Sequence, residues 1–150
     1  MKNIFLSLSA ILILSFASQA QKTKKATAKV NVPENVNESF KGTFASAEKN
    51  KWNRTNIGNY QVSFTNSDSL SQVAEYNEAG VMLKSKIVYN LEALPENVSL
   101  AVEKKYVGAK VTECIKMQIP GVAPYYKVKA ETTTNLKREL FISEEGVVVE

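Results

Sequence analysis

The chain of 150 residues has no histidine and a single cysteine, Cys114. Without histidine the commonest general base and metal ligand is missing, and Ser–His–Asp or Cys–His catalytic arrangements are impossible. One cysteine allows no internal disulfide and forms no zinc or iron–sulfur pattern. We therefore predict that the protein has no cofactor and no metal, and that the apolar core alone holds the fold together.

Phosphate-binding loops and paired catalytic acids are also missing. The six glycines are isolated from one another, so no Gly-rich loop can cradle a phosphate. Glu144 and Glu145 lie in a turn pattern, where solvated charge is the usual outcome. A net charge of +4 is too small to indicate binding to nucleic acid. These absences predict that the protein is not an enzyme. An enzyme that uses Cys114 is disfavoured, because a lone thiol with no base is poorly activated.

The N-terminus has the pattern of a secretory signal peptide over residues 1–20. Lys2 precedes an apolar run from residue 4 to residue 16, and Ser18-Gln19-Ala20 is a small-x-small cleavage site. The alternative, a buried N-terminal helix, fits these features less well. We predict cleavage near Ala20, a periplasmic or secreted location and no transmembrane segment in the mature chain. The lysine-rich residues 21–31 are then expected to form a flexible leader.

A stretch of about twenty residues occurs twice, at residues 32–52 and again 62 positions later at residues 94–114. Each copy opens with an apolar residue followed by Pro-Glu-Asn-Val. Apolar residues then recur at spacings of four, four and three, which place them on one helical stripe. They are Val36, Phe40, Phe44 and Ala47 in the first copy, and Val98, Val102, Tyr106 and Ala109 in the second. The pattern predicts helices over residues 33–49 and 95–109, with Trp52 packing beneath the first.

Alternating apolar and polar residues predict the strands that follow each helix. The first unit has them at residues 60–65, 72–77 and 81–90, and the second at 111–119, 125–132, 138–143 and 147–150, with a rigid turn at 120–124. We predict an α+β fold, in which a helix plus a three-stranded antiparallel meander is repeated in tandem. The repeats span residues 32–93 and 94–150 and form one compact unit, 32–150. The helices are expected on one face of a shared or paired antiparallel sheet.

The order of these motifs resembles the PepSY-like, beta-lactamase-inhibitor-like family of exported bacterial proteins of the Bacteroidetes type. The resemblance rests on residues 32–36, Trp52, 60–64 and 78–80, and in the second copy on residues 94–98, 126–128 and 145–146. It implies a tandem repeat of a helical segment packed on an antiparallel sheet. It also implies that the open face of the sheet grips a partner, and it implies no catalytic residues. The chain departs from the pattern at Cys114, which stands where the first copy has Trp52.

The sheet face opposite the helices is the predicted functional surface. An antiparallel sheet covered by helices on one side leaves its other side open. Strand alternation places a mildly basic set with aromatic residues there, and its candidate binding residues are Glu75, Tyr125, Lys127, Lys129 and Phe141. Lys84, Lys86, Lys116 and Met82 are weaker candidates for the same face. The alternative is an ordinary solvated sheet with a few exposed apolar residues.

Two functions remain open at the level of sequence. The first is a non-enzymatic periplasmic binding module that recognises a protein or peptide of the cell envelope with the open sheet face, for instance as an inhibitor or modulator of an envelope enzyme. The second is a structural or small-ligand-binding envelope module that uses a groove between the two repeats. The sequence does not identify the partner, and it leaves the exposure of Cys114 undecided.

Overall fold

The structure is a computed structural model that describes residues 30–149. The predicted signal peptide and most of the predicted leader lie outside the described residues. The elements are α1 (Glu34–Thr43), β1 (Glu48–Arg54), β2 (Tyr60–Thr65), β3 (Ser71–Tyr76), β4 (Met82–Val88), α2 (Glu96–Lys105), β5 (Lys110–Ile119), β6 (Val122–Glu131), β7 (Lys137–Ser143) and β8 (Val148–Val149). No helix within residues 30–149 is long and apolar enough to cross a membrane.

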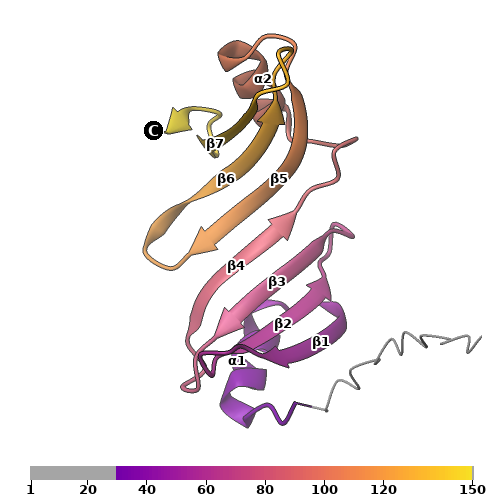
Figure 1. The fold of residues 1–150 in the computed structure, drawn as a ribbon. Coiled ribbons are helices and arrows are strands. Elements are labelled where there is room, and N and C mark those ends of the chain that lie inside the picture. The colour runs from indigo at the N-terminus through magenta and orange to yellow at the C-terminus, as the bar shows by residue number, and fades with distance from the viewer. Residues whose placement is uncertain (1–29, 150) are drawn as a thin grey trace, which may run out of the picture.

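The eight strands form one open antiparallel sheet, in which they lie side by side in the order of the sequence (Figure 1). The α+β prediction is therefore confirmed. The two halves of the sheet meet where β4 pairs with β5, through four residue pairs from Ser85↔Gln118 to Val88↔Ile115. Of the two arrangements that the sequence left open, the structure shows the shared sheet.

Four strands follow each helix, so the predicted three-stranded meander is wrong by one strand in the first half, whereas the four strands predicted after the second helix are all present. In the first half the missed strand is β1, where the sequence predicted the end of a helix. The helix stops at Thr43, and Phe44 takes a non-helical conformation with φ −125° and ψ 62°. Phe44 and Ala47 still pack against the core, but from the connection after the helix. The second helix likewise ends at Lys105 rather than at residue 109.

Two apolar cores lie under the two helices. The first contains Val36, Phe40, Tyr60, Val62, Phe64, Ala74 and Tyr76, and the second contains Val98, Ala101, Val102, Cys114, Tyr126, Val128, Ala130, Leu140 and Ile142. Trp52 packs edge-on against Phe40 with ring centroids 5.4 Å apart, as predicted, although it does so from a strand. Burial of these side chains is the main force that holds each helix against the sheet.

Both helices cover the same face of the sheet. Directly paired residues in an antiparallel sheet point to one side, and the pairing can be followed from strand to strand. Val62 of β2 pairs with Ala74, which pairs with Ser85 of β4, and Ser85 pairs with Gln118 of β5. The register then continues through Lys116 and Cys114 of β5 to Tyr126 and Val128 of β6, which belong to the second core. The predicted placement of the helices on one face is confirmed.

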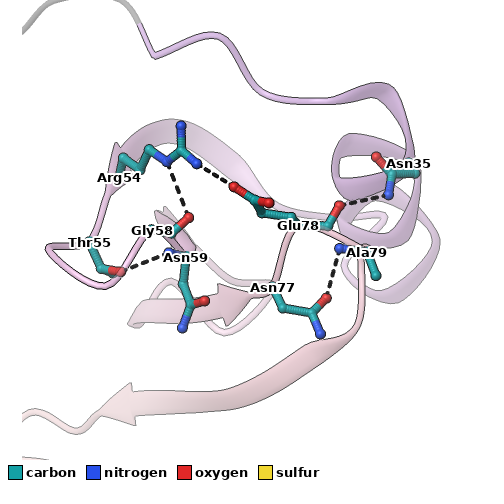
Figure 2. A network of polar contacts seen from close by, with 8 residues as sticks. All are labelled: Asn35, Arg54, Thr55, Gly58, Asn59, Asn77, Glu78 and Ala79. Carbon is teal, nitrogen blue, oxygen red and sulfur yellow. Dashed lines mark hydrogen bonds and ion pairs between the residues drawn. The ribbon is translucent and has the colours of Figure 1, made fainter.

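An asparagine in the first turn of each helix ties that helix to a hairpin. Asn35 Nδ2 donates a hydrogen bond to the Glu78 carbonyl at 3.1 Å (Figure 2), and Asn97 Nδ2 donates to the Glu144 carbonyl. Each hairpin turns at a glycine with positive φ. Gly80 lies against the backbone of Asn35, and Gly146 lies against the backbone of Asn97. These contacts give a physical reason for the Pro-Glu-Asn-Val motif and for the distant Glu-x-Gly or Glu-Gly motif.

A second set of contacts attaches the edge strand to the same hairpin. The Arg54 guanidinium forms an ion pair with Glu78, and its Nε donates to the Gly58 carbonyl at 3.1 Å (Figure 2). The Thr55 hydroxyl accepts a hydrogen bond from the Asn59 backbone N–H at 3.0 Å. The end of β1 is thus held by polar contacts at its turn as well as by pairing with β2.

The junction between the two cores is polar rather than apolar. Gln72 Nε2 donates to Ser85 Oγ at 3.3 Å, and Ser85 Oγ donates to Gln118 Oε1 at 2.8 Å. Gln72 and Ser85 are almost fully buried. A buried polar group is costly without a partner, so this chain of hydrogen bonds favours the register in which β4 meets β5.

Candidate functional site

The open face of the sheet bears most of the predicted binding residues. Tyr125 and Lys127 lie on β6, where their side chains alternate with those of the buried residues Tyr126 and Val128. Lys127 pairs directly with Phe141 of β7. The Tyr125 and Phe141 rings contact each other with centroids 5.9 Å apart, and the Lys127 ammonium lies 6.0 Å from the Phe141 ring centroid. The structure therefore brings Tyr125, Lys127 and Phe141 together in one cluster.

An apolar groove opens beside this cluster, and we call it the β6–β8 groove. It has a volume of about 360 Å³ and is lined by Val122, Ala123, Pro124, Tyr125, Phe141, Ser143 and Val149. Phe141 is 39% exposed and Val149 is 50% exposed, which is high for large apolar side chains. Concave apolar surface next to a few polar groups is typical of recognition sites.

The lysines of the site are held in ion pairs. Lys127 Nζ lies 3.0 Å from Glu139 Oε2, and Lys129 pairs with Glu113. The hydrogen bond from Lys129 to Glu113 raises the pKa of Lys129, so the ammonium stays charged. Both pairs are largely exposed, and such pairs contribute little to stability. The ion pair with Glu139 holds Lys127 beside the groove, whereas Lys129 lies farther along β6 and lines a separate depression with Thr112 and Glu139.

Glu75 lies on the same face but apart from the cluster. It sits on β3, paired with Gln61 and Lys84, and it is buried. Its Oε1 accepts a hydrogen bond from Asn59 Nδ2 at 2.7 Å, and its Oε2 lies 3.1 Å from Lys84 Nζ. The Asn59 hydrogen bond, followed by the nearby Lys84, lowers the pKa of Glu75 below its usual value. Glu75 is therefore an ordered carboxylate in the first half of the sheet, separate from the β6–β8 groove.

Two of the weaker candidates lie on the other face, contrary to the prediction. Lys116 pairs with Ile87 and with Tyr126, so it points to the side that carries the helices. There its ammonium lies 5.7 Å from the Tyr126 ring centroid and forms an ion pair with Glu144. Met82 packs against the first core, because the register shifts where β3 meets β4. The other two, Lys84 and Lys86, do lie on the open face, paired with Glu75 and Val73.

Part of the groove was missed at the level of sequence. Residues 120–124 were predicted as one rigid turn, but Ile119 pairs with Val122, so the turn consists of Pro120 and Gly121 alone. Strand β6 therefore starts three residues early and adds Val122 and Ala123 to the groove. The alternation of Ala123 with Tyr125 was the available signal.

Cys114 is a buried core residue that lies 1% exposed beneath α2. Burial raises the pKa of its thiol to about 11. A thiol in this environment is protonated near neutral pH and is a poor nucleophile. Within residues 30–149, moreover, no group of three Cys, Asp or Glu side chains is placed to hold a metal ion.

Comparison with known proteins shows likeness in structure alone. No family model matches the chain, and no curated protein sequence matches it significantly. A BLIP-like protein from Bacteroides fragilis has a TM-score of 0.70 at 18% identity, over 83% of this chain and 87% of that chain. A DUF2874 family protein from Bacteroides ovatus has a TM-score of 0.66 at 20% identity, over 81% and 86%. A candidate periplasmic protein from Bacteroides eggerthii has a TM-score of 0.64 at 14% identity, over 81% and 88%.

The chain therefore has the fold of these BLIP-like and DUF2874 proteins from Bacteroides. The beta-lactamase-inhibitor-like part of the resemblance predicted from the sequence is supported at the level of fold. The PepSY-like part stays a prediction. Identities of 14–20% carry no residue roles from those proteins to this one.

Proposed function

We propose that the protein is a non-enzymatic binding module of the bacterial periplasm that recognises a protein or peptide with the open face of its sheet. The observation that carries this proposal is the β6–β8 groove, whose apolar lining is next to the Tyr125–Phe141 ring contact. Aromatic side chains in apolar depressions are the usual anchors of protein interfaces. Lys127, held by its ion pair with Glu139, supplies a polar group at the rim of the groove, and Lys129 continues the polar surface farther along β6.

The export and the internal repeat belong to the same proposal. Residues 1–20 are the signal peptide, and cleavage near Ala20 leaves a mature chain that begins near Gln21. The order of one helix and four strands, found twice, and the matching Asn35 and Asn97 contacts support two tandem repeats. The structural likeness to a BLIP-like protein supports inhibition or modulation of an envelope enzyme as the form that binding takes.

A small-ligand site between the two repeats is less well supported. On the helix-bearing face, the junction of the repeats is occupied by the hydrogen-bonded side chains of Gln72, Ser85 and Gln118. Gln72 and Ser85 are 3% and 1% exposed, so these polar groups are satisfied within the chain and are closed to solvent. We therefore favour the open face.

The test is a cross-linking capture from periplasmic extract with the mature chain and two variants. Phe141→Asp places a charge in the groove, and Leu100→Asp places the same charge on the exposed side of α2, where Leu100 is 62% exposed. We expect one defined partner to be captured by the wild type and by Leu100→Asp but lost with Phe141→Asp. Circular dichroism melting of all three proteins checks that each is folded. Equal capture by both variants would rule out the groove as the binding site.

The location is tested separately. Cell fractionation and N-terminal sequencing of the mature protein should find it in the periplasm, beginning at or next to Gln21. A cytoplasmic protein that keeps Met1 would contradict the export proposal.

A further inference from the structure

One row of side chains crosses the open face and leads to the groove. Direct strand pairing places Val73, Lys86, Met117, Tyr125 and Ser143 in line on β3, β4, β5, β6 and β7. Neighbouring strands lie about 4.8 Å apart. Lys86 is therefore about 10 Å from Tyr125 and about 14 Å from β7, the strand in the middle of the β6–β8 groove.

Lys86 differs from the other lysines of the central open face in its charge environment. Lys84, Lys127 and Lys129 each form an ion pair with a glutamate. Lys86 forms none within the described part of the chain, and its direct neighbours across the strands, Val73 and Met117, are apolar. A partner that covers this row removes water from the Lys86 ammonium group, which is costly because no carboxylate of this chain is paired with it. A partner that brings its own carboxylate avoids this cost.

The spacing sets the geometry of the partner. An extended chain advances about 3.3 Å per residue, and its side chains alternate between two sides. Residues i and i+4 therefore point to the same side and lie about 13 Å apart, close to the separation of Lys86 from the centre of the groove.

Building on the proposed function, we infer that the partner presents an extended acidic segment across the strands. One Asp or Glu side chain of the segment pairs with Lys86, and an aromatic or large aliphatic side chain four residues away enters the β6–β8 groove. Recognition then needs both a carboxylate and an apolar anchor at a fixed spacing.

Selection from a random library of twelve-residue displayed peptides, with the mature chain as bait, tests the inference. We expect the selected peptides to carry an acid and a large apolar residue four positions apart. Fluorescence anisotropy with one selected peptide then compares the wild type with Lys86→Ala and Lys51→Ala. Lys51 is an exposed lysine of the same row, but it lies on β1, five strands from β6 and about 24 Å away.

We expect Lys86→Ala to weaken binding about tenfold, Lys86→Arg to retain it and Lys51→Ala to leave it unchanged. Raising NaCl to 0.5 M should weaken binding by the wild type more than binding by Lys86→Ala, because salt screens the ion pair.

The contrary outcomes separate the inference from the proposed function. Peptides that lose binding with Phe141→Asp but not with Lys86→Ala would overturn the acidic-segment inference and leave groove recognition standing. Peptides that bind Phe141→Asp as well as the wild type, or the absence of any selected peptide, would overturn both. A concentration-dependent dimer that Phe141→Asp abolishes would also overturn the inference, because the occupant would then be a second copy of this chain.

Discussion

Replacing Gly80 with alanine tests how the first helix is attached to the sheet. Gly80 has φ +80°, a backbone region that L-residues with a side chain rarely adopt. A Cβ built there would lie 2.9 Å from the Asn35 carbonyl oxygen and 3.1 Å from Ser39 Oγ. The Asn35 oxygen is a backbone atom of α1, so the helix itself has to move, and the Asn35–Glu78 hydrogen bond is then strained.

Gly121 provides a control for the energetic cost of the positive-φ backbone conformation alone. It also has φ +80°, but nothing lies within 4 Å of a Cβ built there. Gly121→Ala should therefore cost about 1–2 kcal/mol, the usual penalty of left-handed backbone in a residue with a side chain. Gly80→Ala adds the steric clash and the weakened hydrogen bond, about 1–2 kcal/mol more. We expect it to lower the free energy of unfolding by about 3 kcal/mol in all.

Urea denaturation followed by two signals measures the effect. The fluorescence of Trp52, the only tryptophan, reports on the first core, and circular dichroism reports on the whole sheet. Gly80→Ala should lower the urea midpoint clearly more than Gly121→Ala. If the two variants differ by less than about 0.5 kcal/mol, close approach of the hairpin to Asn35 does not stabilise the helix, and the argument is wrong.

Three further predictions concern buried polar groups. Ser85→Ala removes the acceptor of the buried Gln72 Nε2 and should cost about 1–2 kcal/mol in a urea titration, whereas Ser63→Ala on the open face should cost less than about 0.5 kcal/mol. The pKa of Glu75 is lowered in the folded state. The ionised carboxylate therefore contributes to the free energy of unfolding above pH 4.5, and this contribution is lost as the pH falls through the folded pKa. The Glu75→Gln variant should therefore lose less stability than the wild type when the pH is lowered. If both proteins show the same dependence of unfolding free energy on pH, this prediction is wrong. Because burial raises the pKa of the Cys114 thiol, the free energy of unfolding should fall as the pH rises from about 9 to about 11. A thiol reagent at pH 8 should react with Cys114 only after the protein unfolds. Rapid reaction of the native protein would show the thiol to be accessible.

The alternation of side chains along a strand was enough to predict which face of the sheet carries the candidate site. The parity of Tyr126 and Val128 is enough to place Tyr125, Lys127 and Lys129 on the opposite face, and the structure agrees. It was not predictable that Glu75 is buried or that Lys127 pairs with Glu139, because both depend on which residues lie across the strand. Register is a property of two chain segments, and one segment does not reveal it.

The helix ends and strand β1 show the same limit in the fold. Helical spacing extended the first prediction through Phe44 and Ala47, since both are apolar and needed for the core. Strand β1 is mostly charged and polar, with a bulge near Lys49, and Trp52 is its one apolar residue. It forms a strand because β2 offers it an edge to pair with. The offset of 62 residues, which aligns Trp52 with Cys114 on a predicted strand, was the one sequence signal for it.

The sequence by itself determined the local units: two helices that begin at Pro-Glu-Asn-Val, strands with a buried and an exposed side, and glycine turns. The periodicity of apolar residues and the residue preferences of turns depend on only a few neighbouring residues, so both can be recognised in the sequence. Only the tertiary structure decided that β4 and β5 join the halves into one sheet, and that Val122, Phe141 and Val149 meet around one groove. Those contacts join residues far apart in the chain, and their free energy depends on mutual packing that no single segment contains.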